Sequence, residues 1–177
     1  MFNINVSEQI SLQLLTDKDA DEFFQLLNKN KEHLRGFMPR IMETKNLEDT
    51  KKVIKIFLNQ LVDNNGFRAA IYYNSDMVGI TGLKYIDWVN KKTEIMYWVD
   101  QDYLGKGITT ACVKKLIDIS FNEYKLNKVV IKSSVDNITS NRIAEKCGFT
   151  LEGVSRQDEL LCSGYTDINV YSLLKKM

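Results

Sequence analysis

The stretch Tyr103-Leu104-Gly105-Lys106-Gly107-Ile108-Thr109-Thr110 places two glycines one residue apart, where a strand-like run gives way to a long amphipathic segment. If a helix begins here, its first amides have no partners within the helix. Those N–H groups and the positive end of the helix dipole favour an anionic ligand. The two glycines alone are equally compatible with an ordinary strand-to-helix turn and with an anion site.

Two common phosphate-binding loops do not match this stretch. A dinucleotide-binding loop needs a third glycine at position 110, which is threonine, and an acidic residue some ~20 residues later at the end of a second strand. An ATP-binding loop needs Gly-Lys-Ser/Thr, whereas Lys106 is followed by Gly107 and Ile108. Any anion bound here therefore belongs to another class of ligand.

The composition predicts one globular domain over residues 1–177. The 24 basic and 23 acidic residues nearly cancel, which argues against nucleic acid or a membrane surface as partner. The N-terminal residues do not resemble a signal peptide, so we expect a cytoplasmic protein. Cys112, Cys147 and Cys162 lack metal-ligand spacing, which predicts reduced thiols and no metal site.

The order of the β-rich and amphipathic segments predicts an α+β domain with about seven strands, about four helices and one βαβ crossover. A turn at Asn74-Ser75-Asp76 indicates a hairpin, and Gly148 is a natural helix end. The expected strands are 10–14, 67–73, 77–85, 93–99, 128–134, 149–156 and 166–174; the expected helices are 16–27, 53–62, 109–125 and 138–146, with 30–43 irregular.

A second segment narrows the choice of anion. Val135-Asp136-Asn137-Ile138-Thr139-Ser140-Asn141-Arg142 continues to Cys147-Gly148-Phe149, about thirty residues after the glycines. Together with the loop, this segment resembles the GCN5-related N-acetyltransferase (GNAT) family. The closer resemblance is to the bacterial ribosomal-protein N-terminal acetyltransferases, and it extends over nearly the whole chain. It also rests on Lys-Asn-Lys-Glu-His-Leu, Thr93-Glu-Ile-Met-Tyr-Trp98, Cys-Gly-Phe-x-Leu-Glu-Gly and Tyr165-Thr-Asp-Ile-Asn-Val-Tyr171.

The resemblance implies the acyl-CoA N-acyltransferase fold, a mixed seven-stranded sheet whose parallel strands 4 and 5, here 93–99 and 128–134, splay apart. Acetyl-CoA, the implied co-substrate, would enter this cleft with its pantetheine arm along the first strand, near Trp98 and Val99. Its pyrophosphate would lie on the amides of Gly105, Lys106, Gly107, Ile108 and Thr109. The family usually has Arg or Gln three residues before the first glycine, whereas this chain has Asp102.

The helix after the second segment carries further implied contacts. Asn137 is a natural N-cap, and the resemblance adds a contact to pantetheine. Ser140 either caps the helix or, as the resemblance suggests, donates a hydrogen bond to the departing CoA sulfur. Asn141, Arg142 and Lys146 are candidates for the nucleotide end of CoA, although a solvated helix face explains the two cations nearly as well.

The amine must lose a proton before it attacks the thioester. At pH 7 this costs roughly 1 kcal/mol for an α-amine of pKa ~7.7 and over ~4 kcal/mol for a lysine of pKa ~10.4, so one carboxylate suffices for a protein N-terminus. By position in the family Glu159 is the candidate base, and Asp158 is the neighbour with which it is most easily confused. Glu94 either faces the cleft and orients the amine or is an exposed residue paired with lysine. His33 lies in the segment that would flank the acceptor; it either contacts the acceptor or, as we expect, lies on the surface.

The sequence thus predicts an acetyl-CoA-dependent N-acetyltransferase whose acceptor is a protein N-terminus, with a ribosomal protein implied by the resemblance. One alternative is a small amine acceptor such as a polyamine, an antibiotic or an aminoacyl conjugate. Another is a non-catalytic CoA-binding module that acts as a sensor or interaction partner. The resemblance also suggests a homodimer, which no residue pattern requires.

Overall fold

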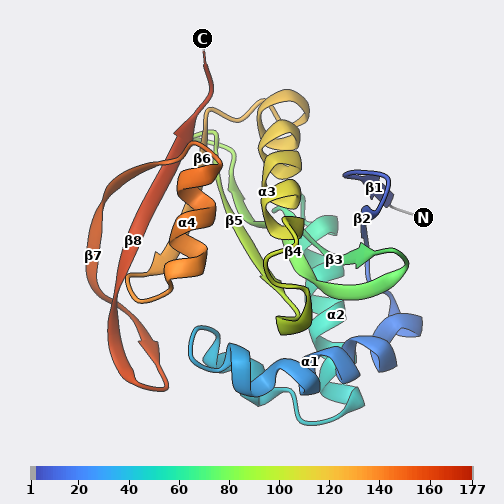
Figure 1. The fold of residues 1–177 in the computed structure, drawn as a ribbon. Coiled ribbons are helices and arrows are strands. Elements are labelled where there is room, and N and C mark those ends of the chain that lie inside the picture. Colours follow the sequence, from blue (N-terminus) through green and yellow to red (C-terminus); the bar gives the residue numbers. More distant parts are fainter. Residues whose placement is uncertain (1–2, 177) are drawn as a thin grey trace.

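Eight strands form one mixed sheet in the order β1-β2-β3-β4-β5-β6-β8-β7 in the computed structural model, which describes residues 3–176 (Figure 1). The β5–β6 pair is parallel, and the other neighbouring pairs are antiparallel. The strands are β1 (Asn3–Asn5), β2 (Ile10–Gln13), β3 (Phe67–Tyr73), β4 (Asp76–Asp87), β5 (Lys92–Val99), β6 (Lys128–Ser134), β7 (Thr150–Leu161) and β8 (Gly164–Leu174), and the helices are α1 (Ala20–Leu34), α2 (Leu47–Val62), α3 (Ile108–Asp118) and α4 (Ile138–Lys146).

The predicted α+β class, the four helices and the splayed parallel pair are confirmed, while the strand number is corrected from seven to eight. The additional strand, β1, has three residues, too few to show a hydrophobic period. The segment predicted to be irregular begins later than position 30, because α1 continues to Leu34. Asn30 remains helical and buried, and its side-chain amide donates to the Leu26 carbonyl.

Two further boundaries differ from the prediction. The helix expected over 109–125 ends as α3 at Asp118 and continues as a π-helical turn over Ile119–Glu123. At the junction the Ser120 hydroxyl donates a hydrogen bond to the Leu116 carbonyl. This bond competes with the backbone hydrogen bond that the same carbonyl accepts in a regular α-helix. The last two strands form a longer hairpin than expected, so that position 159 lies within β7.

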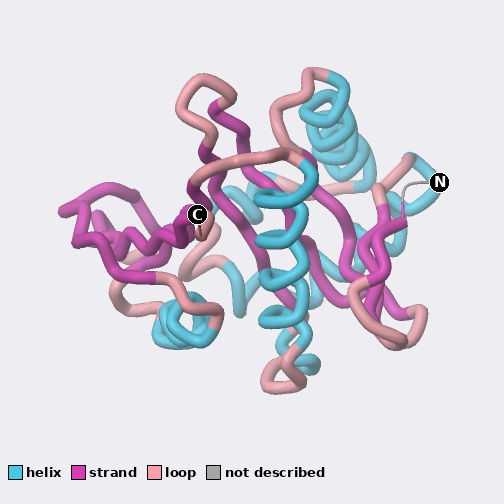
Figure 2. The backbone as a smooth tube through the Cα atoms, turned by 90° about the horizontal axis from the view of Figure 1, so that it is seen from above, coloured by secondary structure: helices cyan, strands magenta, loops and turns pink. Residues whose placement is uncertain are grey.

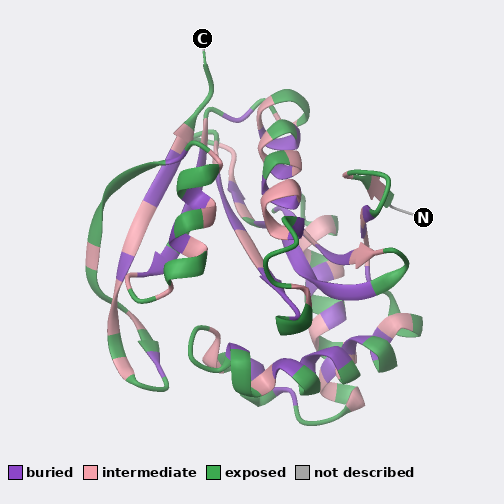
Figure 3. Ribbon diagram, in the orientation of Figure 1, coloured by how far each residue is buried: buried purple, intermediate pink, exposed green. Residues whose placement is uncertain are grey.

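The helices cover opposite faces of the sheet: α1 and α2 lie on one face, α3 and α4 on the other (Figures 1 and 2). Apolar residues at helical spacing, such as Phe23 and Leu27 in α1 or Cys112 and Leu116 in α3, are buried against the strands. Figure 3 shows these buried stripes facing the sheet. Because strands β3 to β5 are covered on both faces, their sequences are nearly continuous apolar runs.

Side chains of β5 alternate between the two faces, as the sequence predicts. Ile95 and Val99 join the core under α3 and α4, whereas Trp98 joins the core under α1 and α2. Among the described residues, no helix is long and apolar enough to cross a membrane. Strand β5 thus contributes side chains to both cores, as β3 and β4 do.

Candidate functional site

The parallel strands β5 and β6 separate after three residue pairs. Their pairing runs from Lys92↔Lys128 to Glu94↔Val130, whereas β6 continues to pair with β8 as far as Ser134. A register shift in β4 between Leu83 and Ile86 lies opposite this point, and such bulges bend a strand locally. The backbone of β5 beyond Glu94 therefore keeps unpaired edge groups on its β6 side.

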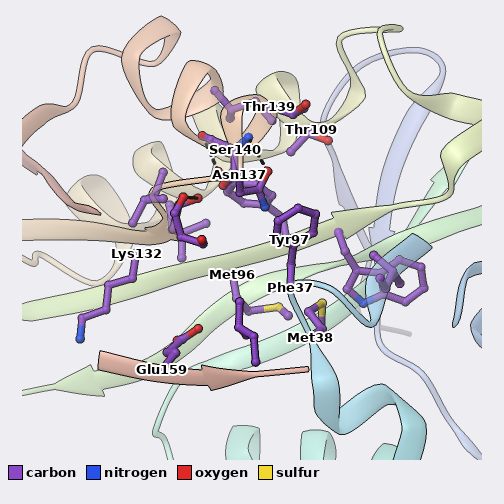
Figure 4. Close-up of a pocket in the computed structure, with 18 of the residues that line it drawn as sticks. Phe37, Met38, Met96, Tyr97, Thr109, Lys132, Asn137, Thr139, Ser140 and Glu159 are labelled. Atoms are coloured by element: carbon purple, nitrogen blue, oxygen red, sulfur yellow. Dashed lines mark hydrogen bonds between the residues drawn. The ribbon is translucent and has the colours of Figure 1, made fainter. Parts of the chain in front are cut away.

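The separation opens a cavity of about 870 Å³ that reaches both faces of the sheet. Figure 4 shows Thr109, Thr139, Ser140 and Asn137 on one side of β5 and Met96, Met38 and Glu159 on the other. The first group comes from the starts of α3 and α4. The second comes from β5, β7 and the segment after α1. The strands therefore separate two chemically different halves of one cavity.

The starts of α3 and α4 meet at the first half of the cavity. Gly107 caps α3 with a left-handed backbone (φ 76°), and Gly105 is also left-handed (φ 77°). The first bonded amide of α3 is that of Ala111, which donates to the Gly107 carbonyl, so the preceding amides lack helical acceptors. A Cβ at either glycine would meet open space. The loop thus has the features that an anion site needs.

The side chains around this loop were not foreseen from the sequence. The Lys106 ammonium lies 4.4 Å from the centre of the Tyr103 ring, a cation–π contact. Asp102, which departs from the family pattern, forms an ion pair with Lys29 at 2.6 Å, and the buried Asp100 shares that lysine at 2.6 Å. Hydrogen bonds donated to both carboxylates raise the pKa of Lys29. Asp102 therefore shares one cation of α1 with Asp100.

Ser140 is held by groups on both sides of the cleft. The Asn137 side chain caps α4 by accepting from the Ser140 amide at 3.1 Å, which confirms the predicted N-cap. The Ser140 hydroxyl lies 3.0 Å from the Tyr97 hydroxyl of β5. Burial raises the pKa of Tyr97 to about 12, so its phenol keeps its proton at neutral pH. Sequence reasoning missed Tyr97, whose only local signal was its place in β5.

The Asn141 side chain forms hydrogen bonds within the protein, and its contact with CoA stays a prediction. Its side-chain amide donates to the Ser134 carbonyl at 3.1 Å and to the Val135 carbonyl at 3.3 Å, and its oxygen accepts from Asn169 at 3.2 Å. These bonds occupy the buried amide and tie α4 to β6 and β8. Arg142 and Lys146, by contrast, are exposed on α4 outside the cavity lining. Their contact with a nucleotide stays a prediction.

Glu159 and Asp158 both line the second half of the cavity, but their surroundings differ. Asp158 pairs with Lys132 at 3.2 Å, and this hydrogen bond lowers the pKa of its carboxyl. No ion pair of Glu159 occurs within the described part of the chain. A bulge lies in β7 between Ser155 and Glu159, where the Gln157 amide donates to the Asp167 side chain at 2.9 Å.

Glu94 combines parts of both predicted alternatives. Its side chain lines the cavity and pairs with Lys84 at 2.9 Å, as the lysine alternative required. It is not exposed, however, because only 6% of its surface is accessible. His33, on α1, is exposed as expected and also borders the cavity. Trp98 and Val99 are buried in opposite cores, so only their backbone groups are available to a ligand.

The cysteines are free, and the described residues contain no cluster arranged as a metal site. Cys112, Cys147 and Cys162 are free thiols, and burial raises the pKa of Cys112 to about 12. Between residues 3 and 176, no cluster of three or more His, Cys, Asp or Glu side chains has the arrangement of a metal site.

Known proteins are similar to this chain in sequence and in fold. A family model described as "Acetyltransferase (GNAT) domain" matches residues 9–150. The ribosomal-protein-serine acetyltransferase of Escherichia coli is 32% identical, over 96% of this chain and 94% of its own. The structure of RimL, a ribosomal L7/L12 α-N-protein acetyltransferase in complex with CoA, superposes with a TM-score of 0.94 at 28% identity, over 98% of both chains. The structure of MccE, a microcin C7 self-immunity acetyltransferase in complex with acetyl-CoA and AMP, superposes with a TM-score of 0.92 at 31% identity, over 97% of this chain and 96% of the MccE chain.

Proposed function

The chain belongs to the acetyltransferase (GNAT) family, and on this basis we propose that it transfers the acetyl group of acetyl-CoA to the N-terminal α-amine of a ribosomal protein. Residues 1–177 would form one catalytic domain. The observation that carries the proposal is the cavity through the β5–β6 cleft, which joins two helix N-termini on one side to an unpaired carboxylate on the other. The names of two relatives, a ribosomal-protein-serine acetyltransferase and RimL, support the acceptor.

The residues of the first half fit the charged and polar parts of CoA. The free amides from Gly105 to Thr109 suit a pyrophosphate, and the unpaired edge of β5 near Trp98 and Val99 suits the amides of pantetheine. When bound, acetyl-CoA supplies the activated thioester. Arg142 and Lys146 are then placed on the exposed side of α4 to meet the nucleotide.

In this proposal Glu159 accepts the proton of the acceptor's ammonium from the opposite side of the sheet. The neutral amine attacks the thioester carbonyl directly, and the electrons of the breaking C–S bond leave with the sulfur. The second amine proton passes to this thiolate, so that CoA leaves as the thiol. The Ser140 hydroxyl donates a hydrogen bond to that sulfur, and Tyr97 positions the hydroxyl from across the cleft. Glu94, neutralised by Lys84, shapes the acceptor side rather than taking the proton.

Cofactor binding and acceptor identity are tested separately. We expect saturating acetyl-CoA, at about 100 times its Kd, to stabilise the protein by about 2.7 kcal/mol and raise Tm by roughly 5–10 °C. A peptide with a free N-terminal serine and an internal lysine should gain one acetyl group at its α-amine, located by mass spectrometry. The same peptide with a blocked N-terminus is the control and should stay unmodified. Acetylation of the lysine in both peptides would exclude the proposed acceptor.

The similarity to MccE favours a second candidate acceptor, a small amine carrying a nucleotide. An aminoacyl nucleotide analogue and spermidine, offered beside the serine peptide, separate the alternatives. If either small amine is acetylated with a kcat/KM well above that of the peptide, the small-molecule function replaces the protein one. Cofactor binding without turnover on any of these amines would instead indicate a non-catalytic CoA-binding module.

The Ser140 and Tyr97 hydroxyls should behave as one unit. We expect Ser140→Ala to lower kcat by roughly 10- to 100-fold, because a hydrogen bond to a developing thiolate is lost. Tyr97→Phe removes a hydrogen bond between neutral groups and should lower kcat by about 3- to 10-fold. If Tyr97 acts through Ser140, the double variant will be no slower than Ser140→Ala alone. Additive losses in steady-state kinetics would show that Tyr97 acts on its own.

A further inference from the structure

The acceptor half of the cavity contains a row of three residues on neighbouring strands. Arg68 of β3 pairs with Gly82 of β4, and Gly82 pairs with Met96 of β5. A Cβ at Gly82 would collide with the Phe67 carbonyl oxygen, so this position cannot carry a side chain. Cross-strand neighbours share a face, and both flanking residues line the cavity. Gly82 therefore contributes no side chain between Arg68 and Met96 in this row.

Within residues 3–176, the Arg68 side chain forms no ion pair or hydrogen bond with a carboxylate. Its Nε is buried without a hydrogen bond, and no ion pair of its guanidinium is found within residues 3–176. The guanidinium carbon lies 5.0 Å from the centre of the Phe57 ring, which fixes the side chain at the edge of the α2 core. Burial, and then repulsion by Arg40, lower the pKa of Arg68, and Glu94 opposes that shift. Leaving such a group unpaired is costly, so its retention suggests an external anion.

The nearby carboxylates do not compensate this charge. Glu94 is paired with Lys84 at 2.9 Å, and Asp158 with Lys132 at 3.2 Å. The acceptor half therefore presents two unpaired groups of opposite sign, the Arg68 guanidinium and the Glu159 carboxylate. A ligand that complements both groups carries an amine and an anion. A peptide with a free N-terminus and an early acidic side chain has this charge pattern.

We propose that Arg68 selects the acceptor by binding the carboxylate of an Asp or Glu side chain in the second or third residue of the acceptor protein. This inference rests on the proposed function. The planar guanidinium offers several donors in a fixed fork, which matches the two oxygens of a carboxylate. Phe57 holds the fork in place before the acceptor arrives, so little side-chain freedom is lost on binding.

The test compares matched peptides on matched enzymes. Hexapeptides with N-terminal serine and Glu or Gln as second residue, and a second pair with the change at the third residue, are given to the wild type, Arg68→Gln and Arg68→Lys. We expect the wild type to prefer one acidic peptide by roughly 10- to 100-fold in kcat/KM. Arg68→Gln should bring the ratio of kcat/KM between the acidic and the neutral peptide to about 1. Arg68→Lys should retain part of the preference.

Each other outcome contradicts the inference in a distinguishable way. Equal rates on the acidic and neutral peptides would overturn the role of Arg68 but leave the proposed function intact. If no peptide is acetylated while a small amine is, both proposals fail. Inhibition by inorganic phosphate in the wild type but not in Arg68→Gln, without a peptide preference, would assign Arg68 to a phosphate instead. A uniform loss on all peptides in Arg68→Gln would indicate a structural role.

Discussion

Replacing Glu159 by Gln is expected to lower kcat by at least about 100-fold, because the variant keeps the shape of the side chain but cannot accept the ammonium proton. Glu159 lines the acceptor half of the cavity and forms no ion pair within the described chain. The KM for acetyl-CoA should change little, since the cofactor half lies across the sheet. Steady-state kinetics with a serine peptide measure both quantities.

The pH dependence of kcat/KM in Glu159→Gln distinguishes the loss of a general base from the loss of a substrate contact. An α-amine of pKa ~7.7 is largely neutral in solution above pH ~9 and then needs no base. The ratio of wild-type to Glu159→Gln kcat/KM should therefore fall as the pH rises from 7 to 9. A ratio that stays constant over this range would remove Glu159 from proton transfer.

Asp158→Asn is the matched control for this variant. Asp158 is the adjacent carboxylate, and its pairing with Lys132 at 3.2 Å lowers its pKa, which makes it a poorer base. The pair is partly exposed, so we expect its loss to change kcat by less than about 3-fold and stability by under about 1 kcal/mol. If Asp158→Asn were the slower of the two variants, the assignment of the base would move to Asp158.

The second large effect is expected at the glycine loop. Gly107→Ala should raise the Kd for acetyl-CoA by roughly 10- to 100-fold, because its Cβ enters the open space beside the free amides where an anion would lie. The left-handed backbone of Gly107 (φ 76°) adds strain of about 1 kcal/mol for any residue with a Cβ. Calorimetric titration with acetyl-CoA measures the affinity.

Gly148→Ala controls for the backbone strain. Gly148 follows the end of α4 with a similar backbone (φ 84°) and equally open space around its Cβ position, but it has no free helix-start amides beside it. Both variants should lose about 2–4 °C of Tm, whereas only Gly107→Ala should lose cofactor affinity. Unchanged affinity in Gly107→Ala would show that the loop is an ordinary strand-to-helix turn.

Much of this architecture follows from signals that are local in the sequence. Alternation in β5, the helical face of α2 and the cap at Asn137 each depend on residues within a few positions of one another. The helix end at Gly148 and the left-handed glycines of the loop are equally local. Boundaries were wrong where tertiary packing extends an element, as in the last turn of α1, or where the element is as short as β1.

The sequence by itself determined the α+β class, the order of the elements, the glycine loop ahead of α3 and the capped helix α4. Only the tertiary structure decided which charges remain free. Asp102 pairs with Lys29, Glu94 with Lys84 and Asp158 with Lys132, and all these partners come from other elements. The same holds for Tyr97 beside Ser140 and for the unpaired Arg68. The physical reason is that secondary structure reflects short-range geometry, whereas the reactivity of a charged or hydroxyl group depends on burial and on partners brought together only by folding.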